Sequence, residues 1–148
     1  MAALDLRLRE PVFTTTYRVI YGDTDAAAVV YNANYLRLFE IGRTEMMRAW
    51  AMPYSEMERA GLILPVTETY LRFKAPARYD EELTIATCLS ELKKVSCRFT
   101  YRITCMRDRG EQLLVRGFTN HACVNRQGRL TPFPAEIREK IAAVLKKG

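Results

Sequence analysis

The chain has 148 residues, of which 49% are hydrophobic and 27% charged, and its formal net charge is +6. This length and composition are typical of a globular protein and exclude a disordered chain, so we expect a single domain over residues 1–148. The basic residues are scattered rather than grouped with aromatic ones, which argues against nucleic acid as a partner, and no apolar run approaches the ~20 residues of a membrane span.

The first ten residues, MAALDLRLRE, carry a charge at every second or third position and lack the apolar stretch of a secretory signal. We therefore expect a cytoplasmic protein. The four cysteines form no C-x-x-C pair, and the chain has one histidine. This pattern predicts buried, reduced thiols and no metal site.

A period-two pattern predicts a first strand over residues 13–21, with Phe13, Tyr17, Val19 and Tyr21 on one face. Tyr21 would then end this strand. Its side chain is predicted either to line a site at the end of the strand or to pack in the core. The pattern alone does not separate these two interpretations.

Two carboxylates, Asp23 and Asp25, follow in a short loop of small residues. The next segment, about 33–50, has apolar residues at helical spacing and predicts a long, mostly buried helix. A carboxylate beside a helix N-terminus, whose first N–H groups lack partners, forms the two halves of a site that polarises an acyl carbonyl. The plainer interpretation is helix capping, and we expect Asp23 to hold the loop in this way.

The rest of the chain predicts a short helix that begins at Pro53 or Tyr54 and stops at Gly61, then four strands and a C-terminal helix. The strands are expected at 66–74, 82–92, 96–107 and 112–125, and the helix at 135–146. Residues 108–110 predict a hairpin turn. Five strands with one long helix after the first indicate an α+β fold.

The stretch from Val19 to Trp50 carries a family resemblance. Tyr21, the D-T-D run at 23–25, the N-A-N-Y run at 32–35 and the R-T-E run at 43–45 follow the order and spacing of the 4-hydroxybenzoyl-CoA thioesterase family and of the similar Tol–Pal-associated acyl-CoA thioesterases. The resemblance implies a hotdog fold, in which a five-stranded antiparallel sheet wraps around a long central helix. It also implies hydrolysis of acyl-coenzyme A thioesters without a cofactor, because coenzyme A is part of the substrate.

The same resemblance assigns roles to three residues. Asp25 would act as nucleophile or general base, the N–H at Asn32 would bind the carbonyl oxygen, and Tyr21 would lie in the site. The side chain of Asn32 is also expected to cap the helix. Relatives often have His at the position of Asn32 and usually Gly at that of Ala28, where Ala costs about 1 kcal/mol if φ is positive.

Residues that would contact the substrate are predicted less sharply. Tyr35 and Phe39 are candidates for the acyl pocket, together with Leu64 and Tyr70. Arg98 and Arg126 are candidates for the phosphates of coenzyme A. Three further basic residues are candidates for the same role, namely Lys93, Lys94 and Arg129. Each of these five basic residues is also typical of solvated surface.

The family resemblance also implies a homodimer or homotetramer, in which sheets pair edge to edge and each site is lined by two subunits. Residues 112–125 and the apolar positions of 13–21 are expected to supply this contact. Two rival functions remain. A catalytically silent acyl-binding or scaffold protein would explain the changes at Ala28 and Asn32, and a hotdog dehydratase would need His121 paired with an acid.

Overall fold

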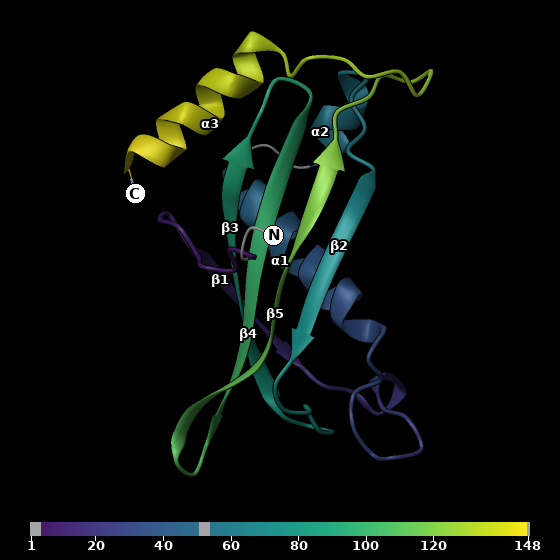
Figure 1. Cartoon of the computed structure of the whole chain (residues 1–148), viewed down its shortest axis with the longest axis vertical. Helices are drawn as coiled ribbons and strands as arrows, with labels where there is room; N and C mark the ends of the chain where they lie inside the picture. The colour runs from purple at the N-terminus through teal and green to yellow at the C-terminus, as the bar shows by residue number, and fades with distance from the viewer. Residues whose placement is uncertain (1–3, 51–53, 148) are drawn as a thin grey trace.

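The computed structural model describes residues 4–50 and 54–147. Its sheet has five antiparallel strands in the order β1-β3-β4-β5-β2, and Figure 1 shows α1 running behind this sheet. The elements in chain order are β1 (Phe13–Arg18), the 3-10 turn η1 (Tyr21–Asp23), α1 (Asn34–Ala49), α2 (Tyr54–Arg59), β2 (Val66–Phe73), β3 (Glu82–Leu92), β4 (Ser96–Arg107), β5 (Gly110–Ala122) and α3 (Ala135–Lys147). The α+β hotdog arrangement expected from the sequence is confirmed.

The sheet has an inner face, which packs on α1, and an outer face, which Figure 1 shows toward the viewer. On the inner face, the ring of Phe39 stacks on that of Tyr101 with 4.1 Å between centroids and an interplanar angle of 4°. A Cβ at Gly42 would lie 2.4 Å from Thr87 Oγ1, so the helix approaches β3 closely only because this residue has no side chain. The long helix is therefore held against the middle of the sheet.

The end of the sheet near α3 is closed by apolar side chains. Phe133, Ile137 and Ile141 are buried there against the same core as Met47. They surround a cavity of about 20 Å³, which is hardly larger than one water molecule. This interior space is too small to hold an acyl group.

The first strand is shorter than predicted, because it ends at Arg18 rather than Tyr21. Val19 still exchanges hydrogen bonds with residues 80 and 81, but the carboxylate of Asp23 then accepts the N–H of Ile20 at 2.9 Å. This bond turns the chain into η1. The side chain of Tyr21 is 79% exposed, so the prediction that it packs in the core is wrong.

The other boundaries agree with the sequence to within three residues, and β3 and β4 have the bounds expected. The β4–β5 hairpin turns at Gly110, whose φ is +105°. Pro53 lies outside the described residues. Among the described residues, no helix combines the length and the apolar character needed to cross a membrane.

Residues 112–125 cannot supply the edge-to-edge strand pairing that was expected between subunits. β5 pairs with β4 on one side and with β2 on the other, so its backbone has no free edge to offer a second copy. The edge strands are β1 and β2. Of the two segments named from the sequence, only 13–21 lies at an edge.

Candidate active site

The loop between β1 and α1 is a small closed unit. Thr24 and Val30 face each other across an antiparallel bridge, and the N–H of Asp25 donates to the carbonyl of Val29 at 2.9 Å. Residues 26–28 form the tip. Ala28 has φ +64°, so the left-handed geometry that favours glycine is present at this position, at a cost of about 1 kcal/mol for alanine.

Asp23 anchors this loop, as expected. Its side chain is buried and accepts hydrogen bonds from Tyr17 Oη at 2.7 Å and from the N–H of Ile20, and it forms an ion pair with Arg37. Burial raises the pKa of Tyr17, which keeps its hydroxyl protonated as a donor. The side-chain amide of Asn34 donates to the Asp23 carbonyl at 2.9 Å. These contacts fix the loop to β1 and to the start of α1.

Asp25 differs from Asp23 in that its side chain is exposed. One carboxylate oxygen, Oδ1, accepts the N–H of Ala27 at 2.8 Å, which is an Asx-turn within the loop. Among residues 4–50 and 54–147, no other group donates a hydrogen bond to this carboxylate. Most of its acceptor capacity is therefore open to water or to a ligand.

The start of α1 leaves backbone donors unused. Within the described parts of the chain, the N–H groups of Asn32 and Ala33 have no hydrogen-bond acceptor. The prediction that the Asn32 side chain caps the helix is wrong, because the N-cap residue is Ala33 and the chain already has helical geometry there, with φ −67° and ψ −22°. Both amides lie at the N-terminal end of α1, which is the positive end of its helix dipole.

A surface groove of about 280 Å³ opens beside Asn32. Asn32 and Tyr35 line it from α1 and the loop before it, and Phe73, Lys74 and Pro76 line it from the end of β2. The ring of Phe73 packs edge-on against Tyr35, with 5.7 Å between centroids, and it remains 53% exposed. The groove therefore has an apolar floor and one cation, Lys74, at its rim.

The structure brings together only some of the residues proposed from the sequence. Asn32 and Tyr35 share the groove, and Asp25 and Tyr21 lie in the loop next to it. Phe39 is fully buried against Tyr101 and does not reach the groove. Lys74 and Phe73 were missed, because nothing in the sequence indicates that the end of β2 meets the start of α1.

The proposed phosphate-binding residues lie elsewhere. Arg98 is on the outer face, where its guanidinium carbon sits 4.0 Å from the centroid of the Phe118 ring. Arg126 donates to the carbonyl of Arg59 in α2, at the end of the molecule opposite the D-T-D loop in Figure 1. The turn with Lys93 and Lys94 lies at that same end. Within one chain, these residues do not converge on the groove.

Two further pocket candidates are also separate from it. Leu64 lines the 20 Å³ interior cavity near α3. Tyr70 faces the outer side of the sheet, where its ring stacks on Phe118 with 5.9 Å between centroids. The acyl-binding candidates from the sequence are therefore reduced to Tyr35.

The single histidine belongs to a chain of buried hydrogen bonds on the inner face. His121 Nδ1 lies 3.0 Å from the carbonyl of Leu64, which can only accept, so Nδ1 carries the proton and Nε2 accepts from Thr119 Oγ1 at 2.8 Å. Thr119 Oγ1 in turn lies 2.6 Å from Tyr101 Oη. Burial lowers the pKa of His121 to about 4. No acid is hydrogen-bonded to this ring among the described residues, so the arrangement does not form a dehydratase pair.

The four cysteines play no part in this site. All four are free and buried, as expected from the sequence. Burial raises the pKa of Cys97 to about 12, so this thiol stays protonated at neutral pH. The nucleophile of the site must come from another residue type.

Comparison with known proteins identifies the family. A family model described as the thioesterase-like superfamily matches residues 19–141. The chain belongs to this superfamily. The resemblance to hotdog thioesterases is thereby confirmed, and the protein is a thioester hydrolase of that group.

Individual relatives agree with this assignment. The chain is 33% identical to an acyl-CoA thioesterase of Haemophilus influenzae, over 85% of this chain and 91% of the relative. A hypothetical protein from Thermus thermophilus has a similar structure, with a TM-score of 0.80, 32% identity, and coverage of 88% of this chain and 98% of the other. The 4-hydroxybenzoyl-CoA thioesterase from a Pseudomonas strain, with a TM-score of 0.79, 24% identity and coverage of 87% and 98%, shares the fold.

Proposed function

We propose that this thioesterase hydrolyses an acyl-coenzyme A thioester to the free acid and coenzyme A. The observation that carries the proposal concerns Asn32, which lines a groove with an apolar floor and whose N–H has no acceptor among the described residues. A thioester carbonyl in this groove would place its oxygen at the positive end of α1. The printed name of the H. influenzae relative, an acyl-CoA thioesterase, supports the same substrate class.

Asp25 supplies the second half of the reaction in this proposal. Its carboxylate either attacks the thioester carbon, which gives a mixed anhydride that water then hydrolyses, or removes a proton from water as it attacks. In both routes the carbonyl oxygen gains negative charge, which the Asn32 N–H stabilises, and the coenzyme A thiolate leaves and is protonated. The reaction neither oxidises nor reduces the substrate, so no cofactor is required.

A second copy of the chain completes the site in this proposal. Large apolar side chains near the loop are exposed in the single chain, including Tyr21, Tyr31, Phe73 and Tyr79. The Tyr21 and Tyr79 rings pack edge-on, with 5.7 Å between centroids. Since β2 is an edge strand, pairing between two copies of β2 would cover this surface and bring basic residues of the partner near the groove. The assembly is therefore a homodimer or homotetramer.

The test is a panel of aromatic, short-chain and medium-chain acyl-coenzyme A substrates, scored by thiol release. The thiols of the protein itself are buried and are measured separately and subtracted. Turnover of any member supports the proposal. Binding without turnover across the whole panel would replace it with the silent acyl-binding protein. Light scattering at micromolar concentration tests the assembly, and a fully active monomer would contradict the shared site.

A further inference from the structure

Three arginines lie side by side across the outer face of the sheet. Arg72 of β2 is directly opposite Arg116 of β5, and Arg116 is directly opposite Arg102 of β4. Their neighbours Leu71, Phe73 and Tyr101 belong to the inner face, so strand alternation places the three arginines on the outer one. Like charges directly opposite each other in a sheet are destabilising. We refer to Arg72, Arg102 and Arg116 as the arginine row.

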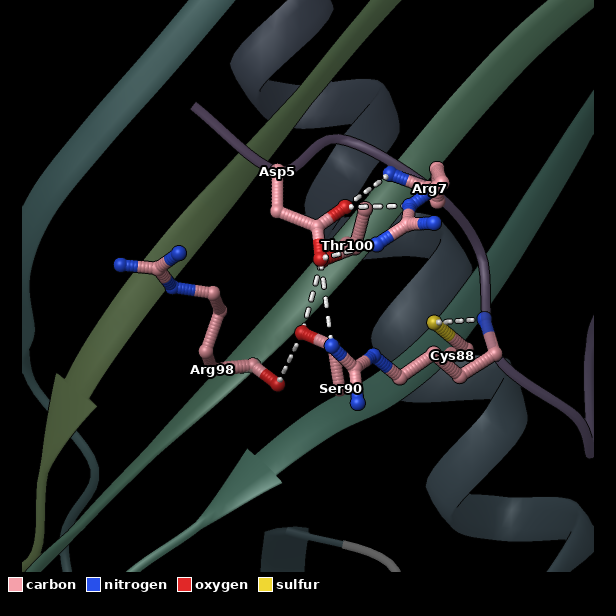
Figure 2. A network of polar contacts seen from close by, with 7 residues as sticks. Asp5, Arg7, Cys88, Ser90, Arg98 and Thr100 are labelled. Carbon is pink, nitrogen blue, oxygen red and sulfur yellow. Dashed lines mark hydrogen bonds and ion pairs between the residues drawn. The ribbon is translucent and has the colours of Figure 1, made fainter. Parts of the chain in front are cut away.

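The row has no counter-charge of its own. Within residues 4–50 and 54–147, none of its members forms an ion pair or a side-chain hydrogen bond, and Arg116 Nε is buried without an acceptor. The carboxylate of Asp5 in the N-terminal segment is already paired, because it accepts hydrogen bonds from Arg7, as Figure 2 shows, and from Arg9. A buried, unpaired guanidinium N–H is costly, so the row is incomplete without an acceptor.

A hollow of about 560 Å³ lies over part of this row. Residues 4–7 of the N-terminal segment form one wall, and Tyr70, Arg72 and Arg116 line the other side. The Tyr70 ring lies nearly parallel to that of Phe118, at an interplanar angle of 15°, and the guanidinium of Arg98 covers Phe118. The hollow thus combines cations with a supported aromatic ring, and its volume falls within the range of small-molecule sites.

We propose that this hollow binds a nucleoside diphosphate, with its phosphates on Arg72 and Arg116 and its base against Tyr70. Guanidinium groups bind phosphate oxygens in a bidentate manner, and aromatic rings stack on bases. Arg102 adds positive potential at the open end of the row. Contact with the same face of a second copy is disfavoured, because it would bring the arginines of one row against those of the other.

A nucleoside diphosphate could come from two sources, a free nucleotide or the nucleotide half of coenzyme A. Binding here does not require hydrolysis.

The direct test is calorimetric titration of the full chain with ADP at low salt. The variant Arg72→Gln/Arg116→Gln is expected to bind ADP at least about tenfold more weakly, because two charged hydrogen-bonding groups are lost. Its matched control, Arg109→Gln/Arg138→Gln, removes the same charge from exposed positions outside the row and is expected to bind as the wild type does. Since Arg116 is half-buried, the variant Arg116→Lys, which keeps the charge but loses the bidentate geometry, provides a milder second measurement.

Titrations with coenzyme A and with pantetheine, which lacks the nucleotide, separate the two sources. If the row binds coenzyme A, the row variant weakens coenzyme A by the same factor as ADP and leaves pantetheine unchanged. If the source is free nucleotide, only ADP is weakened. The proposal is overturned if ADP does not bind the wild type at millimolar concentration or if the row variant binds it equally well. ADP binding without acyl-coenzyme A turnover would contradict only the proposed function.

Discussion

Two groups of polar residues lie next to α1, one buried under the sheet and one in the loop before the helix. They differ in how many of their donors and acceptors have a hydrogen-bond partner. In the buried chain from Tyr101 through Thr119 to His121, each hydroxyl and ring nitrogen has a partner. In the D-T-D loop, the Asp25 carboxylate and the Asn32 N–H are largely open. A group that already has partners stabilises the fold, whereas chemistry requires groups that can still bind a substrate. Histidine is a common general acid or base, but both ring nitrogens of His121 already have partners, so we assign this residue a structural role.

The largest effect that tests this contrast is expected for Asp25→Asn. The change keeps the shape of the side chain but removes its charge, so kcat should fall at least about a hundredfold, which corresponds to about 2.7 kcal/mol. Because Asp25 is exposed, the free energy of unfolding should change little. Steady-state kinetics with the best substrate of the panel and urea unfolding measure the two quantities.

Asp23→Asn is the matched control in the same loop. It weakens the ion pair with Arg37, so we expect a loss of about 1–2 kcal/mol in stability and far less effect on kcat than Asp25→Asn. Equal losses of kcat in both variants, or full activity of Asp25→Asn, would contradict the division of roles between the two aspartates.

The next effect concerns the backbone donor at residue 32. Asn32→Pro removes the N–H and should lower kcat by about a hundredfold, as loss of one oxyanion donor does in other acyl-transfer enzymes. Asn32→Ala keeps the N–H and should retain most of the activity. A severe loss in the alanine variant, with an unchanged circular dichroism spectrum, would assign the role to the side-chain amide instead.

The buried region is expected to respond to pH through stability. The pKa of His121 is about 4 in the folded chain and 6.5 as its ordinary value, so the unfolded state binds the proton first as pH falls. The free energy of unfolding should therefore decrease between pH 6.5 and pH 4, by on the order of 3 kcal/mol. Urea unfolding of wild type and His121→Asn across this range measures the contribution as a difference. An identical pH profile for both proteins would show that His121 is not held neutral.

The smallest effect is expected at the tip of the loop. Ala28→Gly relieves the cost of a positive φ but adds flexibility to the unfolded chain, so a net stabilisation of about 0.5 kcal/mol is expected from thermal or urea unfolding. Ala26→Gly is the matched control, since Ala26 lies in the same tip but does not have a positive φ. This variant should be less stable than the wild type. Destabilisation of both variants to the same extent would mean that Ala28 carries no strain.

The amino-acid sequence determined the fold class, the strands and the family. Alternation along residues 96–107 and helical spacing along 33–50 are local patterns, and each was enough to predict its element. The position of Asp23 and Asp25 before the helix could also be predicted, because the loop and the helix are adjacent in the sequence. The division between the two aspartates into an anchor and an open carboxylate was partly predicted, since the family resemblance assigned the catalytic role to Asp25.

Only the tertiary structure decided which distant residues meet. The groove joins the start of α1 to the end of β2, the Asp23 anchor joins β1 to α1 through Tyr17 and Arg37, and the arginine row spans three strands. Such contacts depend on strand order and register, which residue patterns within one segment do not encode. For the same reason, the strand over 112–125 was predicted to pair with a second copy although it lies inside the sheet. Local periodicity specifies which face of a strand is buried, whereas packing between elements specifies its neighbours.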